Sequence, residues 1–282
     1  MLPLHADHAR TWRESRFVYP VLSRRSGGLS VGINLNPDKV CNFGCVYCQV
    51  DRRSESETQF VATEQLLAEL ESTLELIESG AVYADEKFRQ VPAELRRLND
   101  IAFSGDGEPT TFRNFDLIAT EVAGIKRRRR LDDVKLVLIT NASMFHRPGC
   151  LRALRVLAEN NGEIWAKLDA GTEGYFRQVE RTVIPFQQIL DNITNVACEW
   201  PLVIQSLFLR LNGQPPSPEE VAAYAGRLDA ILSAGGRLAL VQIYTVARRP
   251  AEAAVTALTA AELEQIAAVV RERTSLKVAV FP

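Results

Sequence analysis

Short apolar runs rich in β-branched residues alternate along this chain with longer segments of helical periodicity. This alternation is typical of repeated βα units, in which a parallel sheet is covered by helices. The predicted strands are 29–35, 100–104, 134–140, 164–169, 202–209, 238–245 and 276–281. The predicted helices are 63–78, 115–126, 148–159, 186–199, 218–234 and 260–273. We therefore expect an α/β fold, a partial TIM-like barrel of six βα units with an extra C-terminal strand.

Two of the predicted helices carry start signals. Ser217 precedes Pro218 and two glutamates, which places a cap, a first-turn proline and acidic residues at one helix start. Thr63 stands before Glu64 at the start of the first helix. The sequence shows no internal repeat, low-complexity tract or flexible linker, so we expect one barrel domain over residues 29–282 and an N-terminal extension over 1–28.

Composition narrows the class of protein. The chain has 282 residues, of which 46% are hydrophobic and 24% charged, as in an ordinary globular protein. Residues 1–16 have no apolar core, no run approaches membrane-spanning length, and Cys150 and Cys198 are isolated. These features predict a cytoplasmic protein without a disulfide framework. The formal net charge of −2 gives no bulk attraction to nucleic acid.

The loop after the first predicted strand carries three cysteines in the run Cys41-Asn-Phe-Gly-Cys45-Val-Tyr-Cys48. Parallel barrels build their sites at the C-terminal ends of the strands, so this loop lies where a site is expected. Three thiolates can bind three irons of a four-iron cluster and leave the fourth iron open. A zinc loop is the alternative, but a structural zinc site needs four ligands, and the only histidines are His5, His8 and His146.

Polar residues follow the next two predicted strands. The run Ser104-Gly105-Asp106-Gly107-Glu108-Pro109-Thr110 has two glycines that let the backbone approach a ligand closely, although Gly and Asp also occur in ordinary βα turns. Asn141 and Ser143 follow the third strand. Their side chains can bind a ribose or a carboxylate, or serve as a helix cap or turn.

The later strands also carry polar residues. Trp165, Lys167 and Asp169 share one face of the fourth strand, and the two charges need a ligand or could pair with each other. Gln205 and Gln242 interrupt apolar strands and are expected to face the cavity.

Two basic segments flank strands. Arg248 and Arg249 follow the sixth strand, where they could bind a carboxylate or phosphate or lie at the solvated surface. The basic run 126–130 precedes the third strand, so we expect it at the opposite end of the barrel from the site, as a solvated helix end.

The cysteine run resembles that of the radical S-adenosylmethionine (AdoMet) superfamily. This resemblance implies that Cys41, Cys45 and Cys48 hold a 4Fe-4S cluster whose open iron binds AdoMet and whose electron cleaves it to a 5′-deoxyadenosyl radical. The run from Ser104 to Pro109 looks like the Gly-Gly-Glu-Pro element that supports the AdoMet amino group, here with Asp106 between the glycines.

The same resemblance implies roles for five more residues. Asn141 and Ser143 are similar to the Thr-Asn segment of glycyl-radical activating enzymes. Lys167 and Asp169 are expected to contact the ribose or the carboxylate of AdoMet. A backbone contact of Tyr47 helps to seat adenine.

Four segments, 32–40, 104–110, 167–171 and 241–250, together resemble the radical AdoMet proteins grouped with wyosine synthetases. Characterised wyosine synthases carry a second cluster on upstream cysteines, and no cysteine precedes Cys41 here, so we expect a single-cluster protein. The predicted fold is thus a partial (β/α)6 TIM-like radical AdoMet barrel.

The predicted function is hydrogen abstraction from a small-molecule or peptide substrate, with Gln205, Gln242 and Arg248 as catalytic residues. The resemblance implies a flavodoxin- or ferredoxin-type electron donor. A tRNA base modifier, a glycyl-radical activase and a non-catalytic cluster or zinc module remain as alternatives.

Overall fold

The computed structural model describes residues 12–52, 55–56, 58, 60–248, 250 and 252–282. Arg249, His5 and His8 lie outside the described residues. The chain forms two compact units. The first comprises Met1–Cys41, Arg52–Ile139 and Pro148–Glu163, and the second comprises Asn42–Asp51, Thr140–Arg147 and Ile164–Pro282.

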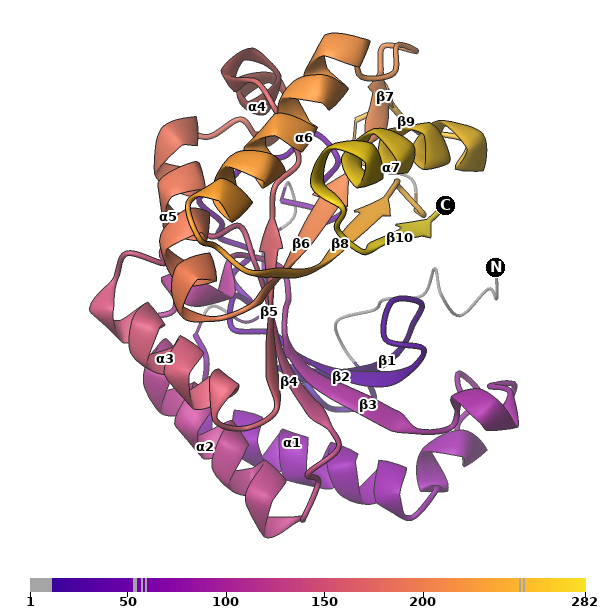
Figure 1. Cartoon of the computed structure of the whole chain (residues 1–282). Helices are drawn as coiled ribbons and strands as arrows, with labels where there is room; N and C mark the ends of the chain where they lie inside the picture. Colours follow the sequence, from indigo (N-terminus) through magenta and orange to yellow (C-terminus); the bar gives the residue numbers. More distant parts are fainter. Residues whose placement is uncertain (1–11, 53–54, 57, 59, 249, 251) are drawn as a thin grey trace. The chain divides into compact units, whose positions relative to one another are not determined.

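The first unit contains four neighbouring strands (Figure 1). They are β1 (Val18–Ser23), β2 (Gly28–Ile33), β3 (Leu98–Phe103) and β4 (Lys135–Thr140), whose last residue belongs to the second unit. Strand β1 pairs antiparallel with β2, whereas β2, β3 and β4 are parallel. The helices are α1 (Thr63–Glu78), α2 (Phe115–Arg128) and α3 (Pro148–Ala158), with 3-10 turns at Ala81–Ala84, Ala93–Leu95 and Pro109–Thr111.

Apolar residues at helical spacing explain how this unit is held together. Leu66, Leu70 and Leu74 lie on one face of α1 and are all fully buried. The first strand is fixed from the same helix, because Glu69 Oε2 accepts hydrogen bonds from the backbone N–H groups of Phe17 and Val18 at 2.8 and 3.2 Å.

The second unit contains the remaining parallel strands (Figure 1). They are β5 (Gly162–Lys167), which begins in the first unit, β6 (Leu202–Leu207), β8 (Leu238–Tyr244) and β10 (Val278–Phe281). A separate antiparallel pair consists of β7 (Leu209–Leu211) and β9 (Val255–Ala257). The helices are α4 (Glu173–Glu180), α5 (Phe186–Glu199), α6 (Pro218–Ser233) and α7 (Ala260–Thr274), and α6 contacts both α5 and α7.

Every predicted strand and helix is present, with ends within two residues of the predicted ones. The expected α/β class with parallel βα units is therefore confirmed. The Ser217 side chain accepts a hydrogen bond from the N–H of Glu220, as its position predicts. The first helix begins at Thr63, as predicted, with Glu64 in its first turn, and its cap residue Ala62 makes no side-chain cap bond.

Four elements were not predicted: β1, β7, β9 and α4. Strand β1 contains Pro20, which is unfavourable inside a strand, and it lies within the expected N-terminal extension. Strands β7 and β9 have only three residues each, and α4 has eight, including Gly174. No helix in the described part of the chain is both long and apolar enough to cross a membrane.

Candidate active site

In the first unit, the segment after β2 is hydrogen-bonded to the loop after β3. The buried side chain of Asn34 donates to Asp106 Oδ2 at 2.7 Å, and the N–H of Asp106 donates to Asn34 Oδ1 at 3.1 Å. The Tyr19 hydroxyl of β1 donates to the carbonyl of Ser104 at 3.0 Å. The loop that was predicted to bind AdoMet is therefore fixed from two neighbouring strands.

The two glycines of this loop are required by close packing. A Cβ atom on Gly105 would lie 2.2 Å from Asn34 Oδ1, and one on Gly107 would lie 2.1 Å from the carbonyl oxygen of Val40. Both clashes are with the 34–40 segment, which leads directly into Cys41. Only glycine permits the two backbones to approach this closely.

Glu108 is 3% exposed, and its carboxylate caps the 3-10 turn that follows. Oε1 accepts the N–H of Thr110 at 3.1 Å and the hydroxyl of Thr110 at 2.5 Å. The residue thus has a structural task in the loop, in addition to the AdoMet contact predicted for it.

The three cysteines of the loop are not joined in disulfides, and each is half-buried. Cys41 is the last residue of the first segment of the first unit, whereas Cys45 and Cys48 belong to the second unit. The Cys45 thiol donates a hydrogen bond to Glu180 Oε2 at 2.7 Å, and the N–H of Cys48 donates to the carbonyl of Cys45 at 2.9 Å. In the part of the chain that the structure describes, no three Cys, His, Asp or Glu side chains are gathered as a metal site.

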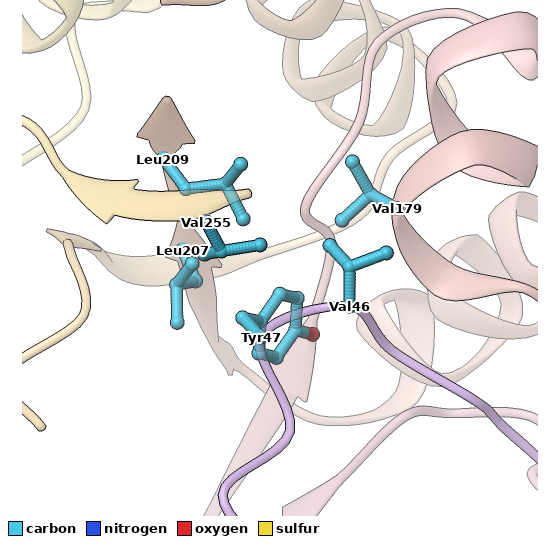
Figure 2. Close-up of a cluster of buried hydrophobic side chains, with 6 residues drawn as sticks. All are labelled: Val46, Tyr47, Val179, Leu207, Leu209 and Val255. Atoms are coloured by element: carbon cyan, nitrogen blue, oxygen red, sulfur yellow. The ribbon is translucent and has the colours of Figure 1, made fainter. Parts of the chain in front are cut away.

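Two side chains of the cysteine loop enter an apolar cluster of the second unit (Figure 2). Val46 and Tyr47 pack with residues of α4, β6, β7 and β9, namely Val179, Leu207, Leu209 and Val255. All six side chains are buried. The middle of the cysteine loop is therefore part of the core of the second unit.

A buried polar network extends from the Tyr47 hydroxyl. This hydroxyl donates to Asp169 and lies 3.2 Å from Glu180 Oε1. Asp169 also accepts the N–H of Leu207 at 2.7 Å and pairs with Lys167, with 3.0 Å between Oδ2 and Nζ. Lys167 donates further to the Tyr244 hydroxyl at 2.9 Å. The alternative in which Lys167 and Asp169 pair with each other thus describes the geometry found here.

Burial and neighbouring charges shift the pKa values of three groups in and beside this network. Burial raises the pKa of Glu180 well above its usual range, and the neighbouring Asp169 raises it further. Burial and Glu180 also raise the pKa of the Cys45 thiol. Burial opposes the charge on Lys167, but Asp169, Tyr244 and Glu180 outweigh it and raise the pKa of Lys167, which therefore remains a cation.

Asn141 and Ser143 lie against the residue that follows Cys41. The Asn141 side chain donates to Asn42 Oδ1, and the Asn42 side chain donates to the Ser143 hydroxyl, both at 2.8 Å. Asn141 Oδ1 also accepts the N–H of Ser143 at 3.0 Å, as in a turn. The two predicted residues are thus joined to the cysteine loop by side-chain hydrogen bonds.

The residues predicted to face the substrate fall in two places. Gln205 and Gln242 are register partners on β6 and β8, are buried, and bond to each other at 3.1 Å from Nε2 to Oε1. Arg248 is half-buried, and its carbonyl accepts a hydrogen bond from the Gln49 side chain at 3.1 Å. Within the second unit the structure therefore joins Tyr47, Lys167 and Asp169 in one network and places the glutamines in a separate pair.

Sequence reasoning missed four residues of these networks, Asn34, Asn42, Glu180 and Tyr244. Asn34 and Asn42 lie inside segments that were recognised, and a polar amide directly after an apolar strand is a signal for Asn34. Tyr244 is the last residue of β8 and lies inside the recognised segment 241–250, four positions before Arg248. Glu180 had no signal, since it closes a helix that the sequence did not predict.

No family model matches the chain. A UPF0026 protein of Methanocaldococcus jannaschii is 30% identical over 168 residues, which cover 57% of this chain and 43% of that protein. A protein of Brachyspira hyodysenteriae named GTPase Obg is 24% identical over 264 residues, which cover 90% of this chain and 33% of that protein. The chain thus spans between a third and a half of the length of these curated relatives.

Three solved structures share the fold. A radical SAM methyltransferase from Sphaerobacter thermophilus has a TM-score of 0.62 at 12% identity, covering 94% of this chain and 68% of that chain. Streptococcus suis SuiB bound to S-adenosylmethionine has a TM-score of 0.60 at 12% identity, covering 92% and 52%. TYW1 with a lysine-pyruvate adduct bound has a TM-score of 0.55 at 16% identity, covering 88% and 74%.

These likenesses confirm, at the level of the fold, the resemblance that the cysteine and glycine motifs indicated. The chain thus shares its α/β fold with structures that include a radical SAM methyltransferase, SuiB bound to S-adenosylmethionine, and TYW1.

Proposed function

We propose that the protein is a radical AdoMet enzyme in which Cys41, Cys45 and Cys48 hold a 4Fe-4S cluster. The observation that carries this proposal is the packing of the Gly105 and Gly107 loop onto the segment that leads into Cys41. In a chain with this fold, that packing brings the predicted AdoMet loop and the start of the cysteine loop together. The radical AdoMet motifs are therefore supported by contact as well as by spacing.

The donor set suits the cluster. Thiolates are the ligands of such clusters, and gaps of three and two residues supply three of them from one short loop. None of the three thiols is in a disulfide and all are partly exposed, and Cys45 would exchange its hydrogen bond to Glu180 for iron. When bound, the cluster supplies the electron that cleaves AdoMet to a 5′-deoxyadenosyl radical, which takes a hydrogen atom from the substrate.

The residues of this chain bind and orient AdoMet in our proposal. Ser104, Gly105, Asp106, Gly107 and Glu108 form the loop for its amino group, which carbonyl and carboxylate oxygens suit as acceptors. Their positions are held by the hydrogen bonds to Asn34 and Tyr19.

The second unit supplies the other proposed AdoMet contacts. Lys167 offers a fixed positive charge for a carboxylate, and Asp169 offers an acceptor that is held by Lys167 and by the N–H of Leu207. Asn141 and Ser143 offer hydrogen bonds for the ribose or the carboxylate. The backbone of Tyr47 seats adenine.

We assign the contacts with the substrate to Gln205, Gln242 and Arg248. The proposed substrate is a small molecule or a peptide. The basic run gives little support to RNA as substrate, because three of its four arginines already have partners. Arg128 pairs with Glu71, Arg129 pairs with Glu78, and Arg127 donates to Asn160. A flavodoxin- or ferredoxin-type protein is the proposed electron donor, in the cytoplasm.

The likeness to TYW1 makes tRNA base modification the second candidate function. It predicts salt-sensitive tRNA binding by this chain, whereas the first candidate does not.

The cluster is tested by metal analysis. Protein reconstituted under anaerobic conditions should hold about four irons and four sulfides per chain. Replacing Cys41, Cys45 or Cys48 by Ala should abolish stable cluster binding. The exposed Cys198 is the control, and Cys198→Ala should bind as much iron as the unchanged protein. Zinc in place of iron in anaerobically purified protein would contradict the proposal.

A further inference from the structure

The C-terminal turn of α4 holds the backbone on both sides of Cys45. The last four carbonyls of a helix have no partner inside the helix. Here two of them have partners in the cysteine loop: the carbonyl of Glu180 accepts the N–H of Gly44 at 3.0 Å, and that of Val179 accepts the N–H of Val46 at 2.9 Å. The cysteine loop and the helix end thus satisfy each other's backbone groups.

The residues after the helix extend this attachment. The Thr182 hydroxyl donates to the carbonyl of Asn42 at 2.9 Å. Arg181 closes the helix in the left-handed region, with a φ of 46°, and pairs with Glu252. A Cβ atom on Gly44 would lie 3.2 Å from the Arg181 carbonyl, so the two segments are in close contact. Residues 179–182 therefore lie along residues 42–46.

The side chain of Glu180 adds a contact to the ligand atom itself. It is 2% exposed, and its carboxyl contacts the Cys45 thiol at 2.7 Å and the Tyr47 hydroxyl at 3.2 Å. A buried carboxyl is costly unless it is hydrogen-bonded. The contacts to Cys45 and Tyr47 offset that cost, and in return they fix the direction of the thiol.

We propose that Glu180 is a positioning residue for Cys45: its carboxyl and the α4 carbonyls hold the second cysteine in place before any cluster is bound. Ordering a free loop costs conformational entropy for every residue fixed. Here that cost is met when the protein folds, so less remains when the cluster binds. The importance of Cys45 as a ligand rests on the proposed function, but the holding is a property of the metal-free protein.

The first test uses metal-free, reduced full-length protein. Hydrogen exchange of the 42–48 segment reports the N–H groups of Gly44 and Val46, and alkylation by iodoacetamide, read by mass spectrometry, reports Cys45 and Cys48 separately. Glu180→Ala should speed exchange of this segment, and its Cys45 should be alkylated about fivefold faster, the factor expected for one typical hydrogen bond, with Cys48 unchanged. The matched control is Glu173→Ala, in the first turn of the same helix, where Glu173 makes an exposed pair with Arg177. It should behave as the unchanged protein.

The variant Glu180→Gln separates the hydrogen bonds that hold the loop from the charge of the Glu180 carboxyl. Gln keeps the shape and hydrogen-bonding capacity of the side chain, so hydrogen exchange should stay close to that of the unchanged protein. If hydrogen exchange in Glu180→Ala also rises throughout β8, this variant unfolds the chain. The hydrogen exchange and alkylation of Glu180→Gln then decide the role of Glu180. Exchange and alkylation in both Glu180 variants equal to those of the unchanged protein would overturn the proposal.

Iron binding distinguishes this proposal from the proposed function. Glu180→Ala should take up iron and sulfide more slowly than the Glu173→Ala control. If the unchanged protein binds no iron, the proposed function fails while the exchange and alkylation results still decide the role of Glu180. If Glu180→Ala takes up iron at the same rate as the unchanged protein and its loop stays protected, the positioning role is wrong.

Discussion

The thiol of Cys45 donates a hydrogen bond to the buried carboxyl of Glu180, with 2.7 Å between Sγ and Oε2, although 135 positions separate the two residues. Cys45 lies in a loop that the sequence marks clearly, whereas Glu180 ends a helix that it does not mark. The residues of the loop therefore predict a chemical role for it, but the sequence gives no signal for Glu180, which supports the loop.

The Tyr47 hydroxyl should stabilise the fold without determining AdoMet affinity. It bonds to Asp169 in the buried network, and the proposed adenine contact uses the backbone of Tyr47. Tyr47→Phe should lower the free energy of unfolding by about 1–3 kcal/mol, measured by urea denaturation of the metal-free protein, because Asp169 loses a buried donor. AdoMet binding by the reconstituted variant should be unchanged.

Tyr83→Phe is the matched control. The Tyr83 hydroxyl is buried but has no hydrogen-bond partner among the described residues. Its removal should leave the free energy of unfolding nearly unchanged. A Tyr47→Phe variant as stable as Tyr83→Phe would show that the network does not stabilise the fold.

Substitutions at residues proposed to bind AdoMet should have different effects on binding and turnover from substitutions at residues proposed to bind the substrate. Glu108→Ala and Asp169→Ala should weaken AdoMet binding, since one opens the loop around Thr110 and the other removes an oriented acceptor. Gln242→Ala and Arg248→Ala should spare AdoMet binding and the uncoupled formation of 5′-deoxyadenosine. Binding is measured by calorimetry and nucleoside formation by chromatography. An equal loss of AdoMet affinity in all four variants would refute this division.

Asp100 on β3 should make the protein less stable as the pH rises. Burial raises the pKa of Asp100, although the Ser30 hydroxyl bonds to Oδ1 and opposes the shift. The folded protein therefore binds this proton more tightly than the unfolded chain, whose Asp titrates at about 3.9. The contribution of Asp100 to stability is greatest below that pH and is lost as the pH rises through the higher folded value.

Asp100→Asn removes this dependence. The variant should gain about 1 kcal/mol at pH 7, where the buried charge is costly, and little at pH 4. Urea denaturation between pH 4 and pH 8 measures both, with the exposed Asp133→Asn as control. If the free energy of unfolding changed with pH in the same way in Asp100→Asn and in the unchanged protein, the prediction would be wrong.

The strands and helices of the parallel units were predictable because their apolar periodicity is set by burial on the sheet. The short elements β7, β9 and α4 were not, since three to eight residues give too little periodicity. The polar residues after the strands were identified by position, but their partners were not. Gln205 and Gln242, for instance, satisfy each other across two strands, which only the register reveals.

Bulk tRNA should bind weakly. The net charge is −2, and Arg128 and Arg129 are paired with glutamates of α1. Phosphate contacts make RNA binding steeply salt-dependent, so titrations at low and moderate salt report them. Replacing Arg127 to Arg130 by Gln should abolish what binding there is. Tight, salt-sensitive binding that survives this change and is lost in Arg248→Ala would favour tRNA modification instead.

The central claim is that this chain cleaves AdoMet reductively. Reconstituted protein, reduced with dithionite under anaerobic conditions, is incubated with AdoMet, and the products are separated by chromatography. We predict that 5′-deoxyadenosine forms with the unchanged protein and with Cys198→Ala, and that none forms with Cys41→Ala, Cys45→Ala or Cys48→Ala. Intact AdoMet after incubation with the fully reconstituted, reduced protein, or equal cleavage by the three cysteine variants, would contradict the claim.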